Sequence, residues 1–396
     1  MRSKFPVGNV TRLEDCFRKA TTAHLLTRKS ASVVVLEKAL MECLSLTASP
    51  LSDAPLQIAP GTPQRLYCES SGSSGTPKLI RRTPASWMAS FEVNTHRFNI
   101  TPRDRYAVLG HLGHSLSLYA AIEAMHIGCG LAVLNDLAPL HQAAALRAHR
   151  ISILYATPSQ LRLICKADAD PLPSVSRILC GGGHLDTALR DQLAVHFPDA
   201  QVVEFFGASE TSFISISDSQ SPRGSVGHAF PGVTLRIGDG LAQGQMGEIW
   251  VKSPYLFDGY EKGDSPLTRW QDGYLSIGEL GKLDEAGNLF LQGRLSRMVT
   301  VADQNVFPEA IEAVIMAQPG IDAAAIITPD DPLRGSSIVA AIVGDVSESA
   351  LRQICRTELG DASVPRYVWV LDTLPMLPAG KPDLKRLETL WRERTI

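Results

Sequence analysis

Residues 151–167 read "ISILYATPSQLRLICKA" and join a short apolar run directly to a helical pattern. The run 151–156 is short, apolar and rich in residues that favour strands, which indicates a buried strand. The segment 158–167 begins with Pro and places apolar residues at helical spacing, which indicates a helix. A buried strand followed at once by a helix is the repeating unit of a parallel α/β sheet.

The same unit recurs on both sides of this stretch. Similar strand patterns occur at 105–110, 130–135, 176–183 and 200–207, and helical patterns occur at 117–128, 140–150 and 186–198. Together they predict a largely parallel α/β sheet from about residue 65 to residue 240. The two strand ends in "LCGGGHL" (179–185) and "EFFGASE" (204–210) carry Gly. Ligands of open α/β sheets bind beyond such strand ends, so a site is expected there.

The pattern changes on either side of this sheet. Residues 31–46 have a helical pattern, and the Pro-rich segment 51–64 is interpreted as a connector. Residues 222–293 hold short strands with tight Gly turns, which predicts a small β subdomain, and residues 294–396 form a small α/β unit. The predicted fold is therefore α/β: a large N-terminal domain (1–293) of parallel α/β sheet layers with a small β subdomain, then a small mobile α+β C-terminal domain (294–396).

Composition and charge exclude several classes of protein. The 396 residues are 44% hydrophobic and 20% charged, which is typical of a globular enzyme. A net charge of −3 argues against nucleic acid as the main partner. The apolar stretch 116–134 contains Glu123 and His126, so it is interpreted as a buried helix running into a strand, not a membrane span. Seven scattered Cys and the absence of a secretory signal predict reduced thiols and a cytoplasmic protein.

The stretch "SSGSSGTPK" (70–78) places small hydroxyl residues and two Gly beside one Lys. Gly permits positive φ angles, so backbone N–H groups and hydroxyls can turn toward one anion, and Lys78 supplies a positive charge. The stretch is not the P-loop pattern, because its two Gly are too close and no Ser or Thr follows the Lys. Composition alone leaves two interpretations open: a phosphate-binding loop and a flexible Ser/Gly linker.

Other motifs accompany this loop in a fixed order. They are "GGGHL" (181–185), "FFGASET" (205–211), "GSVGHAFPG" (224–232), "GEIWVKSPYLFDGY" (247–260), "DGYLSIGELGKLDEAGNLFLQGR" (272–294), "NVFPEAIE" (305–312) and "LPAGKPDLKRL" (377–387). In this order they resemble the adenylate-forming superfamily, which includes acyl-CoA synthetases and aryl-CoA ligases. The resemblance covers about residue 65 to the end of the chain.

The resemblance implies a role for each matching residue. Catalytic roles fall on Lys381, which would stabilise the α-phosphate, on Glu210, which would also hold Mg²⁺, on Ser209 and on His114, which would gate the carboxylate pocket. Nucleotide-binding roles fall on Ser70, Ser71, Gly72, Ser73, Ser74, Gly75, Lys78, Gly181, Gly182, Gly183, Phe206, Gly207, Glu279 and Arg294. The acyl pocket would use residues near Gly182, Phe205 and His228.

The chain departs from the family pattern at several of these positions. Ser209 stands where Thr is usual, Phe206 where Tyr is usual and Glu279 where Asp is usual. The family's Lys-x-x-Gly loop becomes 300–303 (Thr-Val-Ala-Asp), whose Asp adds bulk and negative charge where a thiol arm would pass. The hinge is expected near 294–297, at Ser296. Relatives also carry a longer segment before the phosphate loop, so the front subdomain of this chain is expected to be shortened.

The resemblance implies two half-reactions. ATP and Mg²⁺ would convert a small-molecule carboxylic acid to an acyl-adenylate with release of pyrophosphate, and coenzyme A would then take the acyl group. Two alternatives stay open: transfer to the phosphopantetheine thiol of an acyl-carrier protein, and a catalytically impaired nucleotide-binding homologue. A homodimer is compatible with these expectations, which include no nucleic acid and no membrane span.

Overall fold

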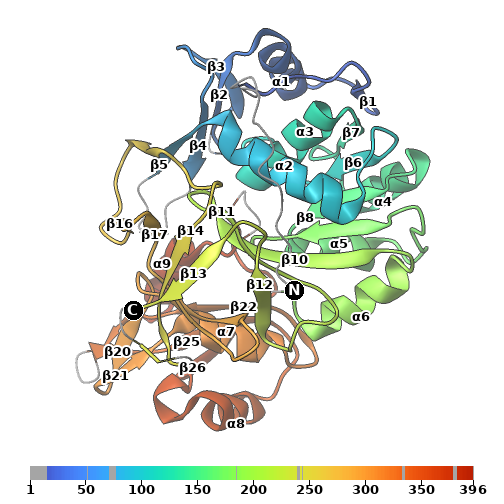
Figure 1. Cartoon of the computed structure of the whole chain (residues 1–396). Coiled ribbons are helices and arrows are strands. Elements are labelled where there is room, and N and C mark those ends of the chain that lie inside the picture. Colours follow the sequence, from blue (N-terminus) through green and yellow to red (C-terminus); the bar gives the residue numbers. More distant parts are fainter. Residues whose placement is uncertain are drawn as a thin grey trace.

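The computed structural model of the chain describes residues 16–50, 52–70, 77–183, 185–238, 241–242, 244–331, 335–377 and 381–395. A central parallel sheet forms the body of the large domain (Figure 1). Its strands are β1 (His24–Leu25), β6 (Arg105–Val108), β7 (Gly130–Val133), β8 (Ile153–Ala156), β9 (Arg177–Cys180) and β10 (Gln201–Ala208). They lie in the order β1-β7-β6-β8-β9-β10, and each is parallel to its neighbours.

Helices cover both faces of the parallel sheet. They are α2 (Pro84–Phe98), α3 (Ser115–Ile127), α4 (Pro139–Ala148), α5 (Pro158–Ala167) and α6 (Thr187–His196). Side chains of β6 alternate between the faces. Tyr106 and Val108 join a core with α2 and α3, whereas Ala107, and Leu109 directly after the strand, join a core with α4, α5 and α6. The strands and helices predicted from the alternating pattern are therefore confirmed, and burial on both faces explains why the strands are almost wholly apolar. The predicted range of 65–240 is too wide for the parallel sheet, because residues 66–70 and 78–82 belong to another sheet and residues 212–237 form antiparallel strands.

The sheet continues beyond β10 through antiparallel strands. They are β11 (Ser212–Ser217), β12 (Ser225–Ala229), β13 (Thr234–Ile237), β14 (Gly247–Lys252), β16 (Arg269–Gln271), β17 (Tyr274–Ser276), β18 (Glu279–Leu283) and β19 (Asn288–Arg294). The order from β10 is β11-β12-β19-β18-β14-β17-β16, and β13 pairs with β14. The predicted β subdomain is present, and it is joined to the parallel sheet edge to edge.

A second sheet packs on the same core as α2 and α3. It contains β2 (Ser45–Ala48), β3 (Leu56–Ala59), β4 (Leu66–Ser70), β5 (Lys78–Arg82) and β15 (Gly259–Lys262), in the order β15-β5-β4-β2-β3, and α1 (Ala31–Glu42) packs beside it. The structure differs here from two of the predictions. The helical pattern 31–46 ends at Glu42, because Cys43 adopts φ 52, and β2 follows. The predicted connector 51–64 contains β3, which pairs antiparallel with β2.

The small C-terminal domain follows β19 (orange to red in Figure 1). Its sheets contain β20 (Val299–Val301), β21 (Gln304–Val306), β22 (Ile321–Ile327), β23 (Asp330–Asp331), β24 (Gly335–Ser336), β25 (Val339–Gly344) and β26 (Tyr367–Val370). Its helices are α7 (Pro308–Met316), α8 (Glu348–Leu359), the short 3₁₀ helix η1 (Asp361–Ser363) and α9 (Leu384–Thr395). The predicted order of a large α/β domain followed by a small mixed domain is confirmed. In the parts of the chain that the structure describes, no helix is both long and apolar enough to span a bilayer.

Candidate active site

The turn between β10 and β11 carries two of the predicted site residues, Ser209 and Glu210. The pairing register of the two strands shifts between Phe206 and Gly207, and Ser212 has a φ of 56°. Gly207 is required here, because a Cβ atom on it would lie 1.8 Å from the Ser212 carbonyl oxygen. The backbone of the turn is therefore set by close approach of its own two strands.

Contacts from two other segments hold this turn. The Ser115 and Ser209 hydroxyls lie 3.0 Å apart, and Ser115 opens α3 directly after His114. The Phe257 N–H donates to the Glu210 carbonyl oxygen at 2.9 Å. The predicted catalytic residues His114, Ser209 and Glu210 are thus brought to one region of the molecule.

Tyr260 connects Glu210 to the end of the Ser/Gly loop. Its hydroxyl donates to Glu210 Oε1 at 2.9 Å and lies 2.9 Å from Thr268 Oγ1. Lys78 Nζ lies 5.5 Å from the centre of the Tyr260 ring, within the range of a cation–π contact. Burial, followed by the charge of Glu210, raises the pKa of Tyr260. Lys78 and Glu210 therefore both contact one tyrosine, which the motif analysis did not single out.

The Ser/Gly loop itself is described only at its two ends. Ser70 ends β4, Lys78 begins β5, and the two residues face each other in the antiparallel pair. Ser71, Gly72, Ser73, Ser74 and Gly75 lie outside the described residues. The loop thus starts and ends at one point, which adjoins Tyr260 and the Glu210 turn.

The Gly-rich strand end after β9 lies beside the end of β10, because the two strands are parallel neighbours. Gly181 packs on the Phe205 ring, and a Cβ atom on Gly181 would lie 2.4 Å from that ring. Gly182 has a φ of 84° and Gly183 is exposed. Phe206 points to the other side of β10 and packs against the antiparallel strands.

The residues proposed for the acyl pocket lie in a row across the sheet. Phe205 pairs with Ile216 in β11, and Ile216 pairs with His228 in β12. His228 is exposed, and it is two strands away from Phe205, about 10 Å at the usual strand spacing.

A second group of charges forms where the C-terminal domain meets the large domain. Glu279 and Arg294 face each other in β18 and β19, and Arg294 Nε donates to Glu279 Oε1 at 2.7 Å. The charge of Glu279 is the main cause that raises the pKa of Arg294, and the charge of Glu210 adds to it. The Glu279–Arg294 pair therefore lies within electrostatic range of the Glu210 turn.

Lys381 joins this group from the C-terminal domain. A short bridge between Met376 and Pro382 and a 2.7 Å bond from the Leu377 N–H to the Lys381 carbonyl oxygen hold its backbone. The residue keeps exposed surface, yet desolvation of its ammonium group lowers the pKa of Lys381 to about 8. Repulsion from Arg294 contributes to this shift, and attraction to Glu279 opposes it. Lys381 and the Glu279–Arg294 pair are thus neighbours, although they come from different domains.

The carboxylates suit a cation bound mainly through a nucleotide. Within the described ranges, no group of three or more His, Cys, Asp or Glu side chains could hold a metal by itself. Glu210 instead offers a single carboxylate near Lys78. That arrangement fits Mg²⁺, which prefers one or two carboxylates together with phosphate oxygens and water.

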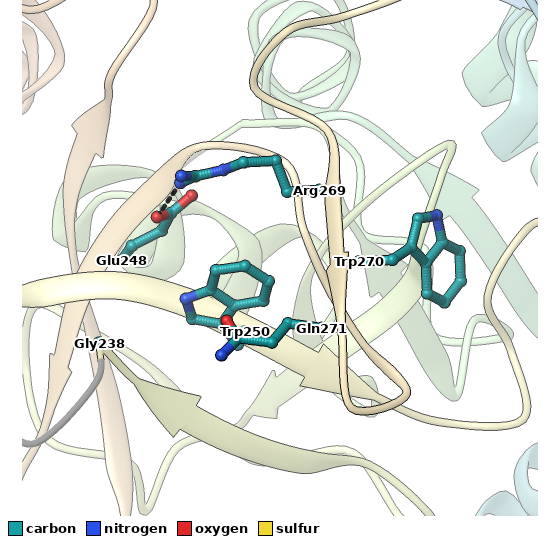
Figure 2. Close-up of a pocket in the computed structure, with 6 residues that line it drawn as sticks. All are labelled: Gly238, Glu248, Trp250, Arg269, Trp270 and Gln271. Atoms are coloured by element: carbon teal, nitrogen blue, oxygen red, sulfur yellow. Dashed lines mark hydrogen bonds and ion pairs between the residues drawn. The ribbon is translucent and has the colours of Figure 1, made fainter.

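A separate cavity of about 540 Å³ lies on the antiparallel strands (Figure 2). Its lining residues are Gly238, Glu248, Trp250, Arg269, Trp270 and Gln271. Arg269 is paired with Glu248, and its guanidinium lies 5.5 Å from the Trp250 ring centre. None of the predicted site residues lines this cavity, so it is not the candidate active site.

Sequence reasoning missed Tyr260 and Arg82. Tyr260 ends the quoted motif 247–260, but nothing in its spacing indicates a contact with Glu210. Arg82 had a signal in the pair Arg81-Arg82 at the end of a strand, because alternation along a strand turns one of two neighbours inward. The structure buries Arg82 and leaves Arg81 paired with Glu261 at 2.9 Å.

Comparison with known proteins identifies the family of this chain. The family model described as AMP-binding enzyme matches residues 16–261, and that of the AMP-binding enzyme C-terminal domain matches residues 310–381. The uncharacterised acyl–CoA ligase YhfT of Bacillus subtilis is 30% identical over 378 residues, which cover 94% of this chain and 76% of that protein.

Solved structures show the same architecture. The amide bond synthetase McbA from Marinactinospora thermotolerans superposes with a TM-score of 0.71 at 26% identity, over 82% of this chain and 68% of that one. The o-succinylbenzoate CoA synthetase MenE of Bacillus subtilis, solved with an acyl-adenylate intermediate, gives a TM-score of 0.71 at 25% identity over the same shares. The chain therefore belongs to the AMP-binding enzyme family, as an AMP-forming acid–thiol ligase.

Proposed function

We propose that this protein activates a small aryl or medium-chain carboxylic acid with ATP and transfers the acyl group to coenzyme A. In the first half-reaction a carboxylate oxygen attacks the α-phosphorus of ATP, the bond to the β-phosphate oxygen breaks, and pyrophosphate leaves. In the second the thiol sulfur attacks the acyl carbon, AMP leaves, and the thiol proton passes to solvent or a base.

The observation that carries this proposal is the convergence of charges from separate segments. Lys381 lies beside the Glu279–Arg294 pair, and the charge of Glu210 also acts on Arg294. Lys78 and Glu210 share Tyr260 as a neighbour. The two ammonium groups and the guanidinium, brought in from three segments, suit a triphosphate, whose charge must be neutralised as the α-phosphorus is attacked.

Each group would then have a distinct task. The loop 70–75 and Lys78 would hold the β- and γ-phosphates, and Ser209 would donate to the α-phosphate. Bound Mg²⁺, held through Glu210, would neutralise charge on the phosphate oxygens. Lys381 would stabilise the α-phosphate in the transition state.

The nucleoside would lie between the strand ends. Gly182 and Gly183 are exposed after β9 and would contact the adenine, and Phe206, which is partly buried, would pack against it. Gly181 and Gly207 would shape the backbone there, because their missing side chains make room for the Phe205 ring and the Ser212 carbonyl oxygen. Glu279 and Arg294 would bind the ribose hydroxyls, with Glu279 Oε2 as an acceptor besides the oxygen already bonded to Arg294. His114 precedes Ser115, which contacts Ser209, and this supports a role near the carboxylate of the acid.

ATP–pyrophosphate exchange with a panel of carboxylic acids tests the first half-reaction. We expect exchange with at least one acid and a loss of about 10² or more in Lys381→Ala, the scale of one preorganised charge contact. Lys385→Ala, which changes an exposed lysine on α9, is the matched control and should keep wild-type exchange. Absence of exchange with every acid, or wild-type exchange in Lys381→Ala, would contradict the proposal.

The acceptor thiol needs its own measurement. Ala302 and Asp303, with φ 48° and 63°, form the turn between β20 and β21, and Asp303 is exposed there. This negative charge favours a second candidate, in which the thiol belongs to the phosphopantetheine arm of a carrier protein. Release of pyrophosphate without formation of an acyl-CoA would support the second candidate, and acyl-CoA formation detected by mass spectrometry would support the first.

A further inference from the structure

We propose that Arg82 is a positioning residue for adenylation, which fixes the turn carrying Ser209 and Glu210 against the strand that begins at Lys78. This inference rests on the proposed function, since it explains how the Ser209–Glu210 turn and Lys78 keep their spacing within the same site. Arg82 would not touch the substrates. It would act through the turn.

The burial of Arg82 is the first observation. β5 ends in Arg81 and Arg82, whose side chains lie on opposite sides of the strand. Arg81 is exposed, whereas Arg82 is 1% exposed and is among the largest fully buried side chains in the described structure. Burial lowers the pKa of Arg82 to about 10, so the guanidinium remains charged at neutral pH. A buried charge is tolerated only where neighbouring groups accept its hydrogen bonds or balance its charge, so the partners of Arg82 indicate its role.

Two of those partners belong to the turn between β10 and β11. Arg82 Nη2 donates to the Ser209 carbonyl oxygen, and Nη1 donates to Ser212 Oγ at 2.8 Å. Two acceptors three residues apart in the chain are thus held by the two ends of one planar fork. A lysine ammonium does not reproduce this geometry, because its three N–H donors share one nitrogen, whereas the guanidinium places its donors on separate nitrogens.

Three further contacts fix the guanidinium itself. Nη1 also lies 3.3 Å from the Tyr255 carbonyl oxygen and 3.2 Å from Ser86 Oγ. The guanidinium lies 5.2 Å from the Trp87 ring centre, and Trp87 Nε1 donates to Ser212 Oγ at 3.2 Å. The start of α2, the turn and the segment before β15 therefore meet at one side chain.

The turn needs such a support. Ser212 occupies left-handed backbone space that is unfavourable for a residue other than Gly, and Gly207 has no room for a side chain. Glu210 accepts a hydrogen bond from Tyr260, and the Ser209 carbonyl oxygen accepts one from Arg82. Together these bonds hold Ser209 and Glu210 relative to Lys78, which lies four residues before Arg82 in β5. A displacement of about 1 Å in such a group can cost about 10²-fold in rate.

The first test is Arg82→Lys, which keeps the charge and removes the fork. We expect the adenylation kcat, measured by pyrophosphate exchange, to fall about 10- to 100-fold, with a higher Mg²⁺ concentration at half-saturation and an unchanged KM for the acid. Ser212→Gly removes one acceptor and suits the positive φ, so a smaller loss in the same direction is expected. Arg81→Lys, the same substitution one residue earlier on the exposed side, should match wild type.

Amide hydrogen exchange supplies a readout that does not depend on turnover. In Arg82→Lys we expect faster exchange of residues 207–212 and unchanged exchange of β9, at a melting temperature close to that of wild type. Should Arg82→Lys fail to fold, Ser212→Gly and Ser212→Ala decide the matter by the same two measurements.

The outcomes separate this inference from the proposed function. The positioning role would be overturned if both Arg82→Lys and Ser212→Gly kept the wild-type Mg²⁺ dependence and the wild-type amide hydrogen exchange at 207–212. It would also be overturned by faster exchange spread evenly over the large domain, because that pattern indicates only a core residue. A wild-type protein that activates no acid, while exchange at 207–212 responds to Arg82→Lys, would overturn the proposed function and support the positioning role.

Discussion

At the scale of single residues, the surroundings of Lys381 change the pH range over which its side chain is charged. Its pKa is lowered to about 8, mainly by desolvation and then by Arg294. The ammonium form, on which the proposed role of Lys381 depends, is therefore present below about pH 8 in the free enzyme and is lost as the pH rises through that value. An ordinary exposed lysine would remain charged well above it.

This sign leads to a pH prediction. The kcat/KM for ATP in pyrophosphate exchange should fall above about pH 8 with the slope of one proton, because kcat/KM reports the free enzyme. In Lys381→Arg this fall should be absent, since a guanidinium stays protonated over the range, although the rate itself will be lower. The same descending limb in Lys381→Arg would show that another group titrates.

A site residue could be predicted from the sequence where it stands in a motif, but not where its role depends on distant neighbours. Lys381, Glu279 and Arg294 stand in motifs with a characteristic order, and the structure places them together. The contacts of Tyr260 and Arg82 link segments far apart in the chain, and no local pattern records such contacts. Roles at the site remain predictions, and the variants above test them.

At the scale of elements, the β10–β11 hairpin determines the shape of the site. Its register shift at Phe206 and Gly207 turns the strand end so that Ser209 and Glu210 project from a tight turn. The Gly at 207 follows from the 1.8 Å approach that a Cβ atom would make to the Ser212 carbonyl oxygen.

Gly207→Ala should therefore damage both stability and activity. Overpacking against backbone typically costs about 1–3 kcal/mol, and the strand pair must open to relieve it. We expect a lower melting temperature and adenylation reduced beyond the change in folded fraction. Gly183→Ala, whose Cβ atom would meet only side-chain atoms at 3.4 Å, controls for the thermal measurement and should leave the melting temperature unchanged. An unchanged melting temperature in Gly207→Ala would contradict the reading of this turn.

At the scale of the whole molecule, the two domains meet with Lys381 beside the Glu279–Arg294 pair. One ion pair across this junction joins Lys166 of α5 to Asp322 of β22 at 3.6 Å, and both side chains are largely exposed. Exposed pairs typically contribute only about 0.2–1 kcal/mol, so the pair can bias the orientation of the two domains only slightly. If adenylation requires this orientation, the pair should affect its rate.

Asp322→Lys should slow pyrophosphate exchange about two- to fivefold at low ionic strength, because it replaces an attraction by a repulsion. The difference should disappear near 1 M salt, where the screening length falls to about 3 Å. Asp345→Lys reverses an exposed charge elsewhere in the C-terminal domain and should behave as wild type. A loss in Asp322→Lys that persists at high salt would point to a cause other than charge.

The sequence by itself determined the alternating strands and helices, the order of the domains and the family, because apolar periodicity and motif order are local properties of the chain. Tertiary structure alone decided which of two adjacent arginines is buried, that Tyr260 joins Lys78 to Glu210, and that the Pro-rich segment before β4 contains a strand. These outcomes depend on which distant segments meet, and a side chain takes its charge state, burial and partners from those segments.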